Sequence, residues 1–122
     1  MILVDTSVWI RFLSDRAPYS AGLERLLTDD QVSGHHLVYG ELLIGDNGGR
    51  TQLLVNYNRM HQAPPVPHQE VVAFVRARKL HGGGIGWIDA HLLASALVGQ
   101  VNLWTADLRL SDIAKDLGVG YP

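Results

Sequence analysis

Short apolar runs of strand length alternate along the chain with longer segments of helical periodicity, and this alternation is the feature that most constrains the fold. Residues 2–4 form one apolar run that ends at Asp5, and residues 101–104 form another. Short strands are also expected at residues 31–33, around Ala63 and from Val119. Strands that alternate with helices favour an α/β fold, with a parallel sheet covered by helices on both faces.

The segments between these runs are predicted to be helices. Apolar residues recur at three- and four-residue spacings over residues 20–29, where an amphipathic helix is expected. Thr6 or Ser7 is expected to cap a short helix that ends near Leu13. Further helices are expected over residues 37–44, 53–60, 69–81, 88–98 and 108–117, and the fourth of these is rich in Ala and Leu and should be buried.

Composition narrows the class of protein. The 122 residues suit a single domain over residues 1–122, able to bury roughly two-thirds of its unfolded surface. The absence of cysteine excludes a disulfide framework and cysteine-ligated zinc or iron–sulfur sites. Asp5 and Arg11 interrupt the apolar start, which fits neither a signal peptide nor a membrane span of ~20 apolar residues. We therefore expect a cytoplasmic protein without a membrane partner, and the net charge of −2 argues against a general polyanion binder.

Four acidic residues stand at the ends of elements or at apolar boundaries, whereas most of the others fit solvated surfaces. Asp5 ends a buried strand, Glu41 lies beside an apolar helix stripe, Asp89 opens an apolar helix and Asp107 follows a strand by a tight turn. Each position also has a structural explanation, as a helix cap, a first-turn anion, a turn residue or a marginal-face glutamate. Asp112 is an alternative to Asp107, although a surface helix position suits it better.

Ligands of parallel sheets bind beyond the carboxyl ends of the strands, where Asp5 and the turn before Asp107 are expected. Carboxylates ~5 Å apart repel by roughly 3 kcal/mol per pair at an effective dielectric of ~20, so a cluster of them calls for a cation. Magnesium and manganese are the natural partners of an all-oxygen site. Such an ion suits phosphodiester chemistry, because it lowers the pKa of bound water and stabilises the attacking and leaving oxygens.

Several of these segments resemble a known family. The opening MILVDTSVWI at residues 1–10, the helix with Glu41, the stretch GIGWIDAHLLAS at residues 84–95 and the turn LWTAD at residues 103–107 are similar to a PIN domain, most of all to the VapC toxins of bacterial toxin–antitoxin pairs. The resemblance extends over nearly the whole chain in matching order. It implies a three-layer α/β/α sandwich with a central, mostly parallel sheet.

The resemblance also implies an activity, a magnesium- or manganese-dependent endoribonuclease. The catalytic acids would be Asp5, Glu41, Asp89 and Asp107, with Glu41 reaching the metal ion through water and the other three binding it directly. Thr6, Ser7 and Thr105 would orient a ligand or water. Expected partners are RNA, a second copy of the chain and a small VapB-like antitoxin whose tail enters the acidic groove. The family often has a basic or polar residue just before the last acid, where this chain has Trp-Thr-Ala, which leaves Asp112 open as the fourth acid.

Other residues are candidates for contact with RNA. Arg76, Arg78 and Lys79 precede the glycine-rich loop, and they suit either phosphate contact or a solvated helix face. Arg11 is a second candidate, for which a surface role is favoured. Trp9 and Trp87 flank the acid motifs, and we expect both to pack in the core rather than stack on bases. No histidine pair has the spacing of a zinc site.

Two functions from other classes remain open. The first is a PIN-like binding module without catalysis, whose acidic pocket captures a basic, arginine-bearing partner tail. The second is a doubly wound phosphoacceptor or phosphatase with Asp5 as the nucleophile. This last function is disfavoured, because Ser7 stands where a second aspartate is needed and no lysine lies near a late strand end.

Overall fold

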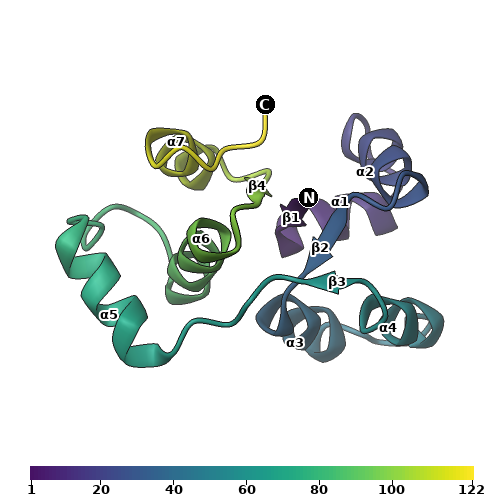
Figure 1. Cartoon of the computed structure of the whole chain (residues 1–122). Helices are drawn as coiled ribbons and strands as arrows, with labels where there is room; N and C mark the ends of the chain where they lie inside the picture. Colours follow the sequence, from purple (N-terminus) through teal and green to yellow (C-terminus); the bar gives the residue numbers. More distant parts are fainter.

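The computed structural model describes all residues from 1 to 122 (Figure 1). Its strands are β1 (Ile2–Val4), β2 (Val32–Gly34), β3 (His61–Gln62) and β4 (Asn102–Trp104). Its helices are α1 (Thr6–Leu13), α2 (Tyr19–Thr28), α3 (His36–Ile44), α4 (Thr51–Tyr57), α5 (His68–Ala77), α6 (Trp87–Gly99) and α7 (Leu108–Asp116). None of these helices combines the length and apolar character that a membrane crossing requires.

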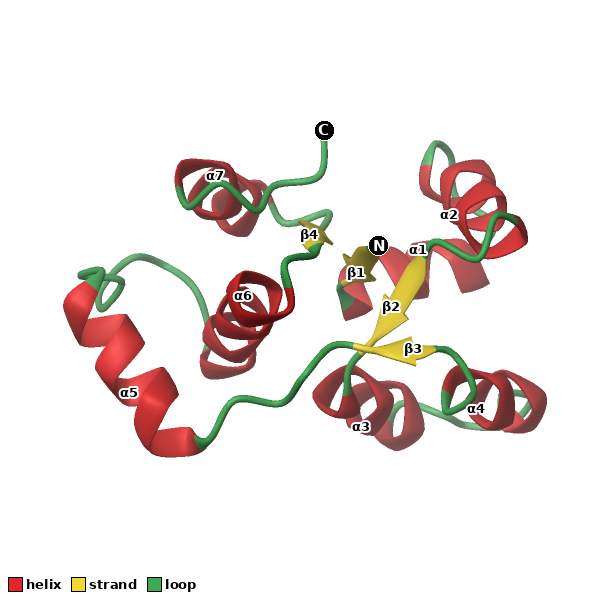
Figure 2. Ribbon diagram, in the orientation of Figure 1, coloured by secondary structure: helices red, strands yellow, loops and turns green.

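The four strands form one sheet in the order β3-β2-β1-β4, and every neighbouring pair is parallel. Helices α1 and α2 lie on one side of the sheet and α5, α6 and α7 on the other, while α3 and α4 pack at its β3 end (Figure 2). This arrangement confirms the α/β sandwich that was predicted. Because all strands run the same way, their carboxyl ends meet at one edge of the sheet.

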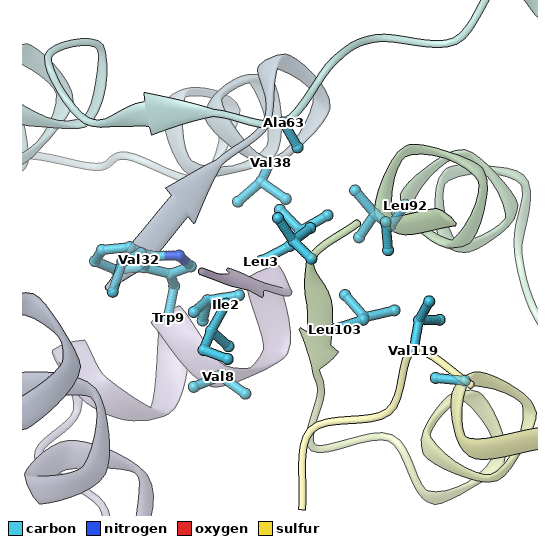
Figure 3. Packing of buried hydrophobic residues seen from close by; sticks show 14 of the residues in the cluster. Ile2, Leu3, Val8, Trp9, Val32, Val38, Ala63, Leu92, Leu103 and Val119 are labelled. Carbon is cyan, nitrogen blue, oxygen red and sulfur yellow. The ribbon is translucent and has the colours of Figure 1, made fainter. Parts of the chain in front are cut away.

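The core fills both faces of the central strand β1, whose three residues are all buried. Successive residues of a strand point to opposite faces. Leu3 accordingly points toward α6, where Leu92 lies, whereas Ile2 lies on the other face with Val8 and Trp9 of α1 (Figure 3). A strand buried on both faces reads as an unbroken apolar run, which is why residues 2–4 show no alternation.

Strand β3 comprises His61–Gln62 and so directly precedes Ala63, as predicted. Two other predicted boundaries are wrong. Helix α5 ends at Ala77 rather than at His81, because the chain turns at Lys79, whose φ of 55° cannot continue a right-handed helix. Near the C-terminus only one bridge forms, between Leu103 and Gly120, in place of the strand expected from Val119.

The start of α1 also differs from the prediction. The residue at the cap position is Asp5, whose backbone is extended and whose side chain makes no capping hydrogen bond. Thr6 and Ser7, the two residues expected to cap this helix, lie inside it. Their hydroxyl groups are turned toward acidic side chains instead, as described below.

A buried polar network behind the sheet edge was not predicted. His35 is fully buried, and its Nδ1 accepts a hydrogen bond from the backbone N–H of Leu37. The neutral ring therefore carries its proton on Nε2, which donates to Ser95 Oγ at 2.9 Å. The Tyr57 hydroxyl accepts from the His35 backbone N–H at 2.8 Å. The network joins the N-terminus of α3 to α4 and α6.

Burial, followed by the neighbouring His36 and His91, lowers the pKa of His35 from 6.5 to about 4. Between pH 6.5 and pH 4, His35 is therefore protonated in the unfolded chain and neutral in the folded chain. We expect this residue to lower the free energy of unfolding by up to about 3 kcal/mol as the pH falls through that window. Urea denaturation at a series of pH values measures the loss.

The matched variants are His35→Asn, which keeps a capping acceptor, and His81→Asn at an exposed histidine. His35→Asn should be less stable at neutral pH but lose less stability on acidification. His81→Asn should keep the parent pH profile. Equal pH profiles for His35→Asn and the parent protein would contradict the assignment.

Candidate functional site

The carboxyl edge of the sheet gathers the acidic residues that the sequence singled out. Asp5 directly follows β1, and Asp107 follows β4 by a short turn. Glu41 comes from α3, the helix that follows β2, and Asp89 is the third residue of α6. Segments far apart in the sequence thus place four carboxylates at the same end of the fold.

Asp5 is the most buried of the four acids, with 7% of its surface exposed. Its Oδ2 accepts hydrogen bonds from Ser7 Oγ at 2.7 Å and from Thr105 Oγ1 at 2.8 Å. Ser7 Oγ in turn accepts from the backbone N–H of Ala106 at 3.0 Å. The Asp5 carboxylate is therefore fixed by its own helix and by the turn after β4.

Glu41 is held in a similar way from a different helix. Its Oε1 accepts a hydrogen bond from Thr6 Oγ1 at 2.7 Å, which joins α1 to α3. The glutamate is half-buried at the boundary that its position beside an apolar stripe indicated. Thr6 and Ser7 each orient one acid, so adjacent hydroxyl groups serve two carboxylates.

Asp89 and Asp107 are held by backbone groups at helix N-termini. Asp89 Oδ2 accepts from the backbone N–H of Gly86 at 3.0 Å, and Asp107 Oδ1 caps α7 by accepting from Leu110 N–H at 3.1 Å. The Asp107 backbone N–H donates to Thr105 Oγ1 at 3.1 Å. Thr105 consequently connects the backbone of Asp107 with the side chain of Asp5.

All four carboxylates share one pattern, in which a single oxygen accepts hydrogen bonds from the protein. The structure assigns no hydrogen bond within the chain to the second oxygen of any of them. These second oxygens are Asp5 Oδ1, Glu41 Oε2, Asp89 Oδ1 and Asp107 Oδ2. The protein thus fixes each acid through one atom and leaves the other for a ligand.

The acids also lie close enough for their charges to affect the pKa of Asp89. Burial raises the pKa of Asp89, the hydrogen bond from Gly86 opposes this, and the charges of Asp5, Asp107 and Glu41 raise the pKa further. Asp112 is exposed on α7 and is not among the groups that act on Asp89. The structure therefore brings Asp107, rather than Asp112, together with the other three.

The donor set can be compared with what a metal ion requires. Four carboxylates, each with one oxygen free of hydrogen bonds within the chain, suit hard divalent ions such as Mg²⁺ or Mn²⁺. No three acidic or histidine side chains converge closely enough to form a ready-made ligand set. Mg²⁺ commonly keeps several waters and uses only one or two protein carboxylates together with substrate phosphates, so the residues fit such an ion. Direct binding by Asp5, Asp89 and Asp107 stays a prediction.

The basic candidates are not all equivalent. Arg11 Nη1 donates to the Ser7 backbone oxygen at 2.9 Å, and its guanidinium lies 5.5 Å from the Tyr19 ring centre, so this arginine braces α1. Arg76 ends α5, and Arg78 and Lys79 follow the helix; all three are exposed. Because α5 stops early, the last two lie on the turn rather than on a helix face.

One arginine near the site was missed by the sequence analysis. Arg109 Nε donates to the backbone oxygen of Gly83 and so ties α7, which Asp107 caps, to the glycine-rich loop that precedes Asp89. Its only signal in the sequence is its position two residues after Asp107, which does not indicate a contact with residue 83.

Of the two tryptophans expected in the core, only one is there. Trp9 is 1% exposed and packs edge-on against Tyr57, with ring centres 5.6 Å apart. Trp87 is 43% exposed, so the prediction of core packing is wrong for this residue. As the first residue of α6, Trp87 precedes the buried part of that helix.

The parallel sheet with acids at its carboxyl edge agrees with a match of the sequence to the PIN domain family over residues 2–116. The chain belongs to the PIN domain family. Its relatives include Ribonuclease VapC32 of Mycobacterium tuberculosis, in strain CDC 1551 / Oshkosh and in strain ATCC 25618 / H37Rv. Each is 47% identical to this chain over 120 residues, a stretch that covers 98% of this chain and 94% of the relative.

Thr105 donates one of the two hydrogen bonds that Asp5 accepts. We therefore expect Thr105→Val, which keeps the shape of the side chain and removes the hydroxyl, to destabilise the fold. Hydrogen bonds to charged groups contribute about 1.5–3 kcal/mol, and we expect the free energy of unfolding to fall by that amount. Urea denaturation at neutral pH without divalent ions measures the change. Thr28→Val is the control, because that exposed hydroxyl only donates to the Glu24 backbone oxygen. Equal losses in the two variants would show that the Asp5 contact contributes little.

Proposed function

We propose that this protein is the toxin of a toxin–antitoxin pair and an endoribonuclease that hydrolyses RNA phosphodiester bonds at the acidic edge of its sheet. The observation that carries the proposal is a set of four carboxylates, each fixed through one oxygen, of which Asp5, Asp107 and Glu41 act together on Asp89. Membership of the PIN domain family and identity with relatives called ribonucleases support it. Helix capping accounts for the hydrogen bonds of Asp89 and Asp107, but it does not explain why Asp5 and Glu41 lie near enough to act on Asp89.

The proposed cofactor is Mg²⁺ or Mn²⁺, held by Asp5, Asp89 and Asp107, with Glu41 in contact through water. When bound, such an ion lowers the pKa of a water molecule and stabilises the charge that develops on the phosphate. It also offsets the charges of Asp5, Asp107 and Glu41, which add to the effect of burial in raising the pKa of Asp89. The proposal therefore explains why a folded protein keeps four acids together.

The side chains of the chain have distinct tasks in this proposal. Ser7 and Thr105 keep Asp5 from rotating, so its free Oδ1 faces the same place in every molecule. Thr6 does the same for Glu41, whose free Oε2 accepts a hydrogen bond from the attacking water and orients it. Rigid positioning of reacting groups lowers the activation barrier because little motion remains to be frozen.

RNA is bound mainly by local contacts in this proposal. The net charge of −2 provides no broad basic surface, but Arg76, Arg78 and Lys79 are exposed beside the loop that leads to Asp89. Phosphate contacts of this kind position RNA without reading its sequence. We place the reaction in the cytoplasm, where RNA is available.

The proposed protein partners are a VapB-like antitoxin and a second copy of the chain. The acidic edge complements a basic antitoxin tail, which would compete with the metal ion for the carboxylate oxygens and obstruct RNA at the same place. Ile44, at the end of α3, is 89% exposed and Val55 of α4 is 43% exposed, which supplies apolar surface for a partner. Both partners are proposed on the strength of the VapC relatives.

Asp5→Asn and Asp89→Asn should abolish RNA cleavage and leave the fold intact, because asparagine keeps an accepting oxygen. Loss of an acid that contacts the reaction should exceed the roughly 10–100-fold typical of losing an outer partner of a metal site. Cleavage of total bacterial RNA and growth of a host expressing each variant measure the effect, and circular dichroism confirms folding.

Asp112→Asn is the matched control, and Asp107→Asn completes the comparison. We expect Asp112→Asn to cleave like the parent and Asp107→Asn to be inactive. Full activity in purified Asp5→Asn or Asp89→Asn would refute the assignment of the reaction to these acids. A parent protein that binds a basic partner tightly but cleaves no RNA with any divalent ion would favour the non-catalytic binding role.

Metal binding can be tested without any substrate. An ion that binds only the folded chain stabilises it by about 2.7 kcal/mol at 100 times its Kd. For a domain of this size, thermal unfolding should therefore shift upward by roughly 10 °C at that saturation with Mg²⁺ or Mn²⁺. Chelation should reverse the shift, and Asp5→Asn should respond far less than Asp112→Asn. Equal shifts in these two variants would place the ion elsewhere.

A further inference from the structure

Trp87 is the most conspicuous aromatic side chain on the surface near the proposed active site. It is 43% exposed, whereas Trp9 is buried in the core and Trp104 is half-buried between Tyr19 and Tyr121. Large aromatic side chains contribute strongly to a core, so exposure of one at this place needs a reason. The ring is not loose, because His68 and His91 pack around it with ring centres 5.2 Å and 5.0 Å away.

Trp87 borders two adjoining hollows, which are lined by residues of α5, the glycine-rich loop and the start of α6. The first has a volume of about 300 Å³ and is walled by Val72, Val75, Arg76 and His81 besides Trp87. The second, of about 130 Å³, shares Val75, His81 and Trp87 and continues to the loop at Gly86. Together they form one apolar recess, which we call the Trp87 recess, with an aromatic ring on its wall.

The one formally charged residue in the walls of the Trp87 recess, Arg76, is basic. Arg76 and His81 line it, and neither hollow has an acidic residue in its wall. Exposed Arg78 and Lys79 lie in the turn between Arg76 and His81. An apolar wall with an aromatic ring and a basic rim is the combination that takes a base on the ring and its phosphate on the rim.

The Trp87 recess adjoins the acidic residues, because Gly86 belongs to both. Gly86 lines its second hollow, and the N–H of the same residue donates to Asp89 Oδ2. Trp87 and Asp89 are the first and third residues of α6, and side chains two apart on a helix point to different sides. A base on Trp87 would therefore belong to a nucleotide beside the one whose phosphate lies at the acids.

We infer that the Trp87 recess is a nucleobase subsite, in which an unstacked base of single-stranded RNA packs on Trp87 while Arg76 and His81 contact its phosphate. The inference rests on the proposed ribonuclease function and specifies its substrate. In a continuous duplex every base is already stacked, so the recess selects single-stranded segments and loops. The subsite positions RNA and takes no part in the chemical step.

Binding of RNA to the Asp5→Asn protein tests the subsite without cleavage. The probe is a short fluorescein-labelled single-stranded RNA of mixed sequence, followed by anisotropy, with a blunt duplex of the same sequence for comparison. Stacking of one base contributes about 1–3 kcal/mol, so Trp87→Ala should weaken single-strand binding by roughly 5- to 150-fold. Duplex binding should hardly change, and Trp87→Phe should restore most of the affinity.

Tryptophan fluorescence identifies the ring that meets the base. In an Asp5→Asn protein that also carries Trp9→Phe and Trp104→Phe, single-stranded RNA should quench the emission of Trp87. The matched control carries Trp9→Phe and Trp87→Phe and keeps Trp104, and its emission should not be quenched by the RNA. Cleavage by the otherwise unaltered protein should show a raised KM for Trp87→Ala, with kcat little changed.

The possible failures can be told apart. Equal RNA affinity of Trp87→Ala and its parent would overturn the subsite, even where the parent cleaves RNA. A Trp87→Ala protein that loses self-association, as measured by light scattering, but keeps its RNA affinity would make the recess an interface between copies and overturn the inference. Quenching by RNA, together with a parent protein that cleaves no RNA although Asp5 is intact, would support the subsite and refute the ribonuclease.

Discussion

The four carboxylates at the edge of the sheet repel one another, and the surrounding structure must hold them together against this repulsion. Asp5, Glu41, Asp89 and Asp107 come from four separate parts of the chain, and the parallel sheet brings those parts to one edge. Water alone would let such side chains turn away from one another. Hydroxyl and backbone N–H groups oppose this by binding one oxygen of each acid. The fold thus supplies the donors that keep the charges together.

The turn after β4 has a central place among these donors. Thr105 is almost buried, donates to Asp5 and accepts from the backbone of Asp107, so a single hydroxyl relates two acids that lie 102 positions apart in the numbering. Ser7 approaches the same hydroxyl at 3.3 Å. The β1–β4 pairing that brings these groups within reach is continued by the Asp5 N–H, which donates to the Trp104 backbone oxygen at 2.9 Å. The register of β1 and β4 therefore determines how Asp5, Thr105 and Asp107 lie relative to one another.

Much of the fold could be predicted because strand and helix periodicity are local properties of the sequence. The strand at residues 2–4 and the helices at both ends of the chain follow directly from such patterns. The positions of the acids at element ends likewise indicated that they would meet, since parallel strands share a carboxyl edge. Features that depend on contacts between distant residues could not be read in this way. The pairing of His35 with Ser95, the Arg109 contact with Gly83 and the exposure of Trp87 each depend on a neighbour 26 or more positions away or on the absence of one.

The division of each carboxylate into a fixed oxygen and a free one has a genetic consequence. Replacement of an acid by its amide preserves an accepting oxygen for the fold and removes the negative charge on which the proposed chemistry depends. A single change of this type can therefore silence the chemistry while the chain continues to fold. Descendants altered in this way would still present the same surface to their protein partners, and they could persist as inactive competitors of the enzyme from which they arose.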